Sequence, residues 1–257
     1  MISPRLGFVT LIAALVGCSG GGGDDGGIAQ PAPNQSASGI WQGTLSLGGS
    51  IVNDVHCLLT VAGELACILT DPVNDELAGA ARGTIQVANG SQVGGSGTVY
   101  AAPGYALADG SSVVGGFTVT SGTVSERNTI SLMISTFGQS GTIAAVFNPS
   151  YDRDSSLATV AASYSVFDIY GDPASFAIDS NGALFSQTAS GCVGNGQVGV
   201  VNPQFNGYTV NVTVSNCLGL NGSYQGFAVT TDSGGTNNVF LFAAFNNLAA
   251  IVGAPLK

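Results

Sequence analysis

Residues 208–214 read Tyr-Thr-Val-Asn-Val-Thr-Val, so that apolar and polar side chains alternate at every position. Because successive side chains of a β-strand point to opposite faces of a sheet, this period of two predicts a strand with one buried face. Residues 117–120 (Phe-Thr-Val-Thr) and 129–134 (Thr-Ile-Ser-Leu-Met-Ile) follow a similar pattern. The sequence shows no convincing amphipathic helical pattern. We therefore predict an all-β fold.

Turn signals separate the predicted strands at intervals of about eight to twelve residues. Each places Gly after a small or polar residue, at Ala62-Gly63, Asn89-Gly90, Asp109-Gly110, Asn181-Gly182, Asn206-Gly207, Asn221-Gly222 and Gly234-Gly235. Such pairs tolerate the positive φ that tight hairpins require. We expect an antiparallel, hairpin-rich barrel or sandwich.

The chain contains a weak internal repeat. A hairpin at 61–65 in the first half resembles one at 178–184 in the second, and Gly-spaced strands follow each. This predicts two tandem eight-stranded units, a first β unit at 39–148 and a second at 149–257, with the boundary within 148–156. One continuous larger barrel fits nearly as well and remains an alternative.

Four of the five cysteines form two pairs, each flanking a predicted turn. Cys57 and Cys67 lie on either side of Ala62-Gly63, while Cys192 and Cys217 flank the turn at 202–207. Folding the chain at these turns brings each pair within bridging distance, so we predict the disulfides Cys57–Cys67 and Cys192–Cys217. A zinc site is the weaker alternative, since close Cys pairs at ligand spacing are missing. No metal and no cofactor are predicted.

Composition restricts the partners. Hydrophobic residues make up 45% of the chain, which is enough for a packed core, and the formal net charge is −10 with only 5 Lys and Arg residues. Nucleic acid binding requires a basic surface, so we expect no nucleic acid partner. A polybasic patch for anionic lipid is equally unsupported.

No catalytic residue is predicted. The lone histidine, His56, has no recognisable Ser-His-Asp context. The candidate carboxylates mostly stand beside turn-forming residues; they are Asp71, Asp75, Glu76, Asp152, Asp154, Asp168 and Asp172. The clusters at 71–76 and 152–154 offer oxygen ligands for calcium, although neither has the spaced loop of an EF-hand. Trp41, in Gly-Ile-Trp-Gln-Gly at 39–43, is expected to plug the base of a barrel or cap a core and is a candidate ligand contact.

The N-terminus has the three parts of an export signal. One cation, Arg5, precedes the apolar stretch 6–16, which is too short to span a membrane, and Leu-Val-Gly-Cys follows at 15–18. This segment resembles a bacterial lipobox. The resemblance implies a signal peptide at 1–17, a lipidated Cys18 carrying palmitate or a similar acyl chain, and, because Ser19 follows, the outer membrane. Loss of Arg5 with the signal takes the formal charge from −10 to −11.

Residues 18–38 carry the lipidated Cys18 and then a Gly-rich and Pro-containing linker. This start resembles the Gly-tethered surface lipoproteins, a group with eight-stranded β-barrels that includes factor-H-binding protein and transferrin-binding protein B. Residues 190–226 resemble a repeat in uncharacterised proteobacterial lipoproteins. Neither resemblance implies a specific partner, because no binding loop of those proteins can be aligned to this chain.

These observations favour a membrane-anchored, β-rich lipoprotein that acts by binding or by a structural role in the envelope. Its partners are the membrane, through the lipid, and a protein or small ligand that the sequence does not identify. Two alternatives stay open. One is a hydrolase of envelope polymers with paired carboxylates, and the other is a membrane-embedded β-barrel.

Overall fold

The computed structural model describes residues 33–49, 51–74, 76–102, 114–167, 173–217 and 219–257. Residues Ala32–Lys257 form one compact unit. The predicted signal segment 1–17, Cys18, most of the linker, the Asp109-Gly110 turn and the carboxylates Asp75, Asp168 and Asp172 lie outside the described residues.

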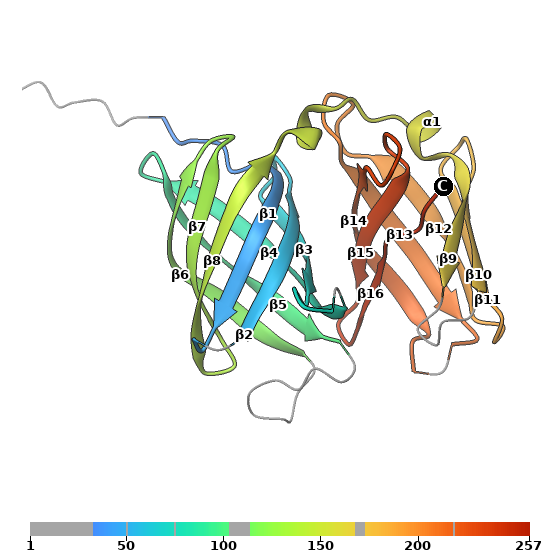
Figure 1. Ribbon diagram of the computed structural model, residues 1–257, viewed down its shortest axis with the longest axis horizontal. Coiled ribbons are helices and arrows are strands. Elements are labelled where there is room, and N and C mark those ends of the chain that lie inside the picture. Colours follow the sequence, from blue (N-terminus) through green and yellow to red (C-terminus); the bar gives the residue numbers. More distant parts are fainter. Residues whose placement is uncertain (1–32, 50, 75, 103–113, 168–172, 218) are drawn as a thin grey trace, which may run out of the picture. The chain divides into compact units, whose positions relative to one another are not determined.

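The first eight strands form a closed antiparallel barrel in which each strand pairs with the next and β8 returns to β1 (Figure 1). The strands are β1 (Gly39–Leu47), β2 (Ile51–Leu59), β3 (Glu64–Thr70), β4 (Leu77–Ala88), β5 (Gln92–Ala101), β6 (Val114–Ser125), β7 (Thr129–Thr136) and β8 (Gln139–Asn148). Alternate side chains point inward, as the burial pattern of β7 illustrates: Ile130, Leu132, Ile134 and Thr136 are buried. The interior of the barrel is therefore lined mainly by aliphatic residues.

Two short helices connect this barrel to a second antiparallel sheet of eight strands. They are the 3-10 helix η1 (Pro149–Asp152) and α1 (Leu157–Val160). The second sheet consists of β9 (Ala162–Phe167), β10 (Pro173–Ile178), β11 (Ala183–Thr188), β12 (Val193–Val200), β13 (Tyr208–Ser215), β14 (Gly222–Thr231), β15 (Val239–Phe245) and β16 (Ala250–Gly253). The prediction of an all-β, hairpin-rich fold with two eight-stranded units is confirmed.

Equivalent turns of the two halves have the same pattern of backbone hydrogen bonds. In the β2–β3 turn, Thr60 N–H donates to the Glu64 carbonyl, and Ile85 N–H on β4 donates to the carbonyl of Gly63 (2.9 and 2.8 Å). In the β10–β11 turn, Asp179 and Ala183 pair in the same way at 2.9 Å, and Val198 N–H on β12 donates to Gly182 at 2.7 Å. These are the two hairpins from which the sequence repeat was predicted, so β2, β3 and β4 have their counterparts in β10, β11 and β12.

The halves differ in how they close. In the barrel, β1 and β8 pair over eight positions, from Ile40↔Asn148 to Leu47↔Gly141. In the second half, β16 has four residues, and the C-terminal Leu256 bridges β9 and β15 instead, at Ser165 and Val239. Pro255 beside it is fully buried. The first half is thus a complete barrel, whereas the second is a curved sheet that the last residues close at one point.

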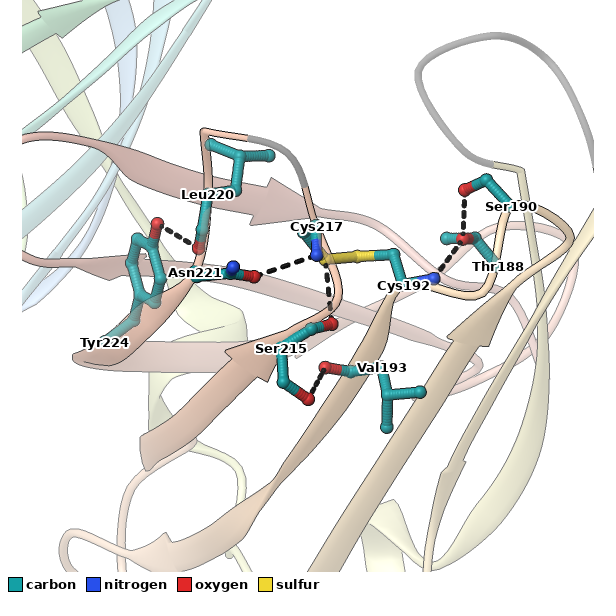
Figure 2. The surroundings of a disulfide bond; sticks show 9 residues. All are labelled: Thr188, Ser190, Cys192, Val193, Ser215, Cys217, Leu220, Asn221 and Tyr224. Atoms are coloured by element: carbon teal, nitrogen blue, oxygen red, sulfur yellow. Dashed lines mark hydrogen bonds between the residues drawn. A yellow bond between two sulfur atoms is a disulfide. The ribbon is translucent and has the colours of Figure 1, made fainter.

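Both predicted disulfides are confirmed. Cys57 and Cys67 are directly opposite each other on β2 and β3, and their side chains belong to the barrel core. Cys192 and Cys217 join the start of β12 to the segment after β13, with the Cα atoms 4.7 Å apart (Figure 2). The N–H of Cys192 donates to the Thr188 hydroxyl, and the N–H of Cys217 donates to the side-chain oxygen of Asn221. The turns on both sides are therefore fixed to the disulfide.

The segment that connects the two halves contacts an equivalent turn in each of them. Asp152 forms an ion pair with Arg127 in the β6–β7 turn, and the adjacent Arg153 forms a two-point ion pair with Asp232 in the β14–β15 turn. Apolar outward-facing residues of the barrel also pack with residues of β14 to β16 in shared buried clusters. The ring of Tyr100 contacts that of Phe245, and the other members include Leu58, Ile68, Ala80, Val229 and Ala243. Consequently, the outward side chains of Leu58, Ile68, Ala80 and Tyr100 are buried against the second half.

Candidate ligand-binding site

The barrel encloses a cavity of about 580 Å³. Most of its wall is aliphatic or aromatic and comes from strands β1 to β8. The apolar residues of the wall include Leu45, Val55, Leu65, Cys67, Leu69, Ala81, Ile85, Val99, Phe117, Leu132, Ile134 and Ile143. Ligand sites in proteins usually measure about 300–1,000 Å³ and are predominantly apolar with a few polar groups. The cavity therefore has the size and lining of a small-molecule site.

The cavity opens at the end of the barrel formed by the β1–β2, β3–β4 and β7–β8 connections. Val52 and Val73 line it there and are 49% and 86% exposed. The polar residues of the lining, Asn53, Asp71 and Thr136, are also at this end. We call this end the mouth. Its apolar side chains face water, so a ligand that covers them gains burial of apolar surface.

Phe137 lies at the mouth with unfavourable backbone geometry. Its φ is +48°, a value that bulky L-residues rarely adopt, and its ring lines the cavity. The ring lies against Gly115 on β6, where an added Cβ would overlap it. Strained residues persist where the surrounding structure holds them, often at binding sites. Gly115 thus provides the space that places the Phe137 ring over the mouth.

Trp41 fills the opposite end of the barrel. It is 2% exposed, its indole N–H donates to the Ala37 carbonyl at 2.9 Å, and its ring meets Phe147 edge-on. Leu59, Val93, Val124 and Ile130 complete this part of the core. The expectation that Trp41 plugs the base of a barrel agrees with this placement. The ring does not belong to the described cavity wall, so the ligand contact suggested for Trp41 stays a prediction.

The core of the second half is packed with aromatic rings. Phe240 is fully buried and has the rings of Tyr164, Phe176, Tyr208 and Phe242 at centroid distances of 6.0–6.2 Å. Ile85 and Val198 are equivalent, because each donates to the glycine carbonyl of its turn. Two residues after them, Val87 pairs with Val93 in the barrel and Val200 pairs with Tyr208 in the second half, so Tyr208 is the counterpart of Val93. Desolvation in this core raises the pKa of the Tyr208 and Tyr164 hydroxyls. At this position the first half therefore carries a smaller side chain than the second.

The other candidate residues do not converge on one place. His56 points out of the barrel beside β14 and β15, where it lines a small crevice of about 30 Å³ with Gln42 and Phe227. Asp152 is engaged by Arg127, and Asp71 is at the cavity mouth. Within the described part of the chain, no group of three or more His, Cys, Asp or Glu side chains is arranged to hold a metal ion.

Among the described residues, no helix has the length and apolar content needed to cross a membrane. No protein-family model matches the chain, and neither a curated protein nor a solved structure matches it. The geometry of the cavity is therefore the basis for assigning a function.

Sequence reasoning did not identify the cavity residues. It noted Asp71 only as a turn carboxylate, and it did not single out Asn53, Thr136 or Phe137. A usable signal was present in the side-chain sizes: the predicted inward positions of 39–148 are rich in Ala, Val and Gly, whereas those of 157–252 include several Phe and Tyr.

Proposed function

We propose that this protein is a membrane-anchored lipoprotein whose first β-barrel binds a small apolar molecule. The observation that carries the proposal is the apolar cavity of about 580 Å³, open at one end and filled by Trp41 at the other. An eight-stranded barrel has an interior just wide enough to hold one small ligand when its inward side chains are not large.

The polarity of the wall supports a ligand site in a barrel that faces water. The inward side chains of β6 and β7 are buried and mostly apolar, whereas Thr118, Thr120, Ser131 and other outward residues are exposed and polar. Membrane barrels show the reverse arrangement, with an apolar band outside and a polar lumen. The disulfide Cys57–Cys67 within the wall adds rigidity, which favours a preformed cavity.

The test is titration with diphenylhexatriene, a neutral rod-shaped fluorophore. The proposal predicts a saturable increase of its fluorescence together with quenching of Trp41, the only tryptophan of the chain. Ala81→Phe places a ring in the cavity and should weaken binding at least about tenfold, because it takes the volume and apolar surface that the probe would occupy.

Ala144→Phe is the matched control, because Ala144 is exposed on the outer face of β8 and the chemical change is the same. It should bind the probe as the unmodified protein does. Circular dichroism checks that both variants fold. Equal probe affinity of the folded Ala81→Phe and Ala144→Phe variants would contradict a site inside the barrel.

The anchor has a separate test. Replacing Cys18 by Ala should abolish metabolic labelling with a radioactive fatty acid and leave the precursor uncleaved, because the thiol is the group that receives the lipid in the lipobox family. Labelling that survives in the Cys18→Ala protein would refute the anchor without affecting the ligand proposal.

A further inference from the structure

Among the described residues, the cavity mouth carries a carboxylate and no cation. Asp71 lines the cavity, and one of its side-chain oxygens accepts hydrogen bonds from the N–H groups of Val73 and Asn74 at 2.8 and 3.4 Å. The other oxygen has no partner among the described residues. The backbone N–H of Asp71 donates to the Glu76 carbonyl, so a second acidic residue is close by. As far as the described residues go, one carboxylate oxygen is therefore open to a ligand.

The four described cations lie elsewhere, and each has a partner. Arg82 contacts Asn247 and the face of Tyr100, Arg127 pairs with Asp152, Arg153 pairs with Asp232, and Lys257 donates to the Thr159 carbonyl. None of them belongs to the described cavity wall. An anionic head group at the mouth would consequently find no counter-charge there.

The remaining polar groups of the mouth favour a head group that is not an anion. The Thr136 hydroxyl already donates to the Gly116 carbonyl at 2.9 Å, so it offers a ligand only lone pairs. Among the described side chains that line the cavity, the Asn53 amide is the one that can still donate a hydrogen bond. An anion requires several donors, whereas a hydroxyl, an amide or an ammonium group can use the acceptors of Asp71 and Thr136.

We infer that the cavity takes neutral or cationic amphiphiles, such as an alkylamine or a long-chain alcohol, and discriminates against fatty acids and other anionic amphiphiles. This inference rests on the proposed ligand site. The apolar wall strengthens the discrimination, because charges interact more strongly beside a region of low dielectric constant than in water. The net charge of −10 acts in the same direction at longer range.

The test uses three forms of one fluorophore: neutral diphenylhexatriene, its trimethylammonium derivative and its propionic acid derivative. The cationic form should bind at least about fivefold more tightly than the anionic form at low salt, in line with the strength of a partly exposed ion pair. The ratio should fall as salt is added, because exposed charges are screened.

Asp71→Asn should bring the ratio of cationic to anionic affinity close to one, because it removes the charge that distinguishes the two forms. Asn retains the side-chain oxygen that caps the turn, so the loop is preserved. Asp54→Asn is the matched control: it makes the same charge change on the neighbouring strand β2, at a residue outside the described cavity wall. It should leave most of the ratio in place.

The outcomes separate the two proposals. Binding of the neutral probe with equal affinities for the cationic and anionic forms overturns the charge inference alone, as does an equal effect of Asp54→Asn and Asp71→Asn. Failure of the neutral probe to bind overturns the proposed function itself.

Discussion

The two halves of this protein share a strand plan and differ in what their interiors contain. The barrel is lined by Leu, Val, Ile and Ala and has a cavity of about 580 Å³, whereas the second half places four aromatic rings around Phe240. The barrel closes by eight β1–β8 pairs, and the second half closes through Leu256. The difference teaches that a repeated backbone alone does not produce a binding site: the sizes of the inward side chains determine whether the interior is hollow.

The largest expected effect tests this difference directly by adding the same ring to each interior. Ala228→Phe should destabilise the second half by about 3 kcal/mol or more, because Ala228 is 2% exposed between β13 and β15 in the aromatic core. Ala81→Phe, which points into the cavity, should change stability by less than about 1 kcal/mol. Urea denaturation measures both values, and equal losses would show that the two interiors are packed alike.

Removal of the disulfides should cost the two halves different amounts. The Cys192–Cys217 bond closes a loop with a sequence separation of 25, and the Cys57–Cys67 bond one of 10. In the chain-entropy description, the longer loop should contribute about 3 kcal/mol and the shorter one somewhat less. Thermal denaturation of the two double Cys→Ala variants shows which disulfide contributes more to stability. A larger loss of stability for the Cys57 and Cys67 variant would mean that this disulfide stabilises the barrel wall by more than loop closure.

Trp41 and Tyr164 are each the third residue of the first strand of their half, and each donates to the carbonyl four residues earlier. Tyr164→Phe leaves the Val160 carbonyl buried without this donor and should cost about 1–2 kcal/mol. Tyr224→Phe is a matched control, since its hydroxyl donates to Leu220 in a less buried setting. We expect a smaller loss there, measured by urea denaturation; equal losses would contradict the argument from burial.

The smallest expected effect concerns the ion pair of the second half. Hydrogen bonds from Arg153 lower the pKa of Asp232 to about 2. A lowered pKa in the folded state means that the ionised carboxylate stabilises the fold above the ordinary Asp pKa, and that this contribution is lost as the pH falls toward 2. Asp232→Asn should therefore lower the melting temperature slightly at pH 7 and leave it unchanged near pH 2, where a persistent difference would argue against the ion pair.

Features set by local sequence could be predicted, and those set by the shape of the interior could not. The turns at Gly63, Asn89-Gly90 and Gly182 follow from residues that tolerate positive φ, and the disulfide Cys57–Cys67 follows from the symmetric placement of its cysteines about one turn. The closure by Leu256 depends on a long-range bridge that no local pattern encodes.

The volume of the cavity depends on the sizes of many inward side chains together and on the curvature of eight strands. Asp71 illustrates the limit. Its neighbours mark it as a turn residue, and only the closed barrel brings its carboxylate to the mouth beside Asn53 and Thr136.

The most direct test of the central claim is crystallographic. Crystals of the chain soaked with a neutral iodinated alkane should show an anomalous difference peak inside the barrel, between Leu45, Ala81 and Phe117, and none within the aromatic core of the second half. Peaks confined to the outer surface, or a peak among Phe176, Tyr208 and Phe240, would contradict the assignment of the first barrel as the ligand site.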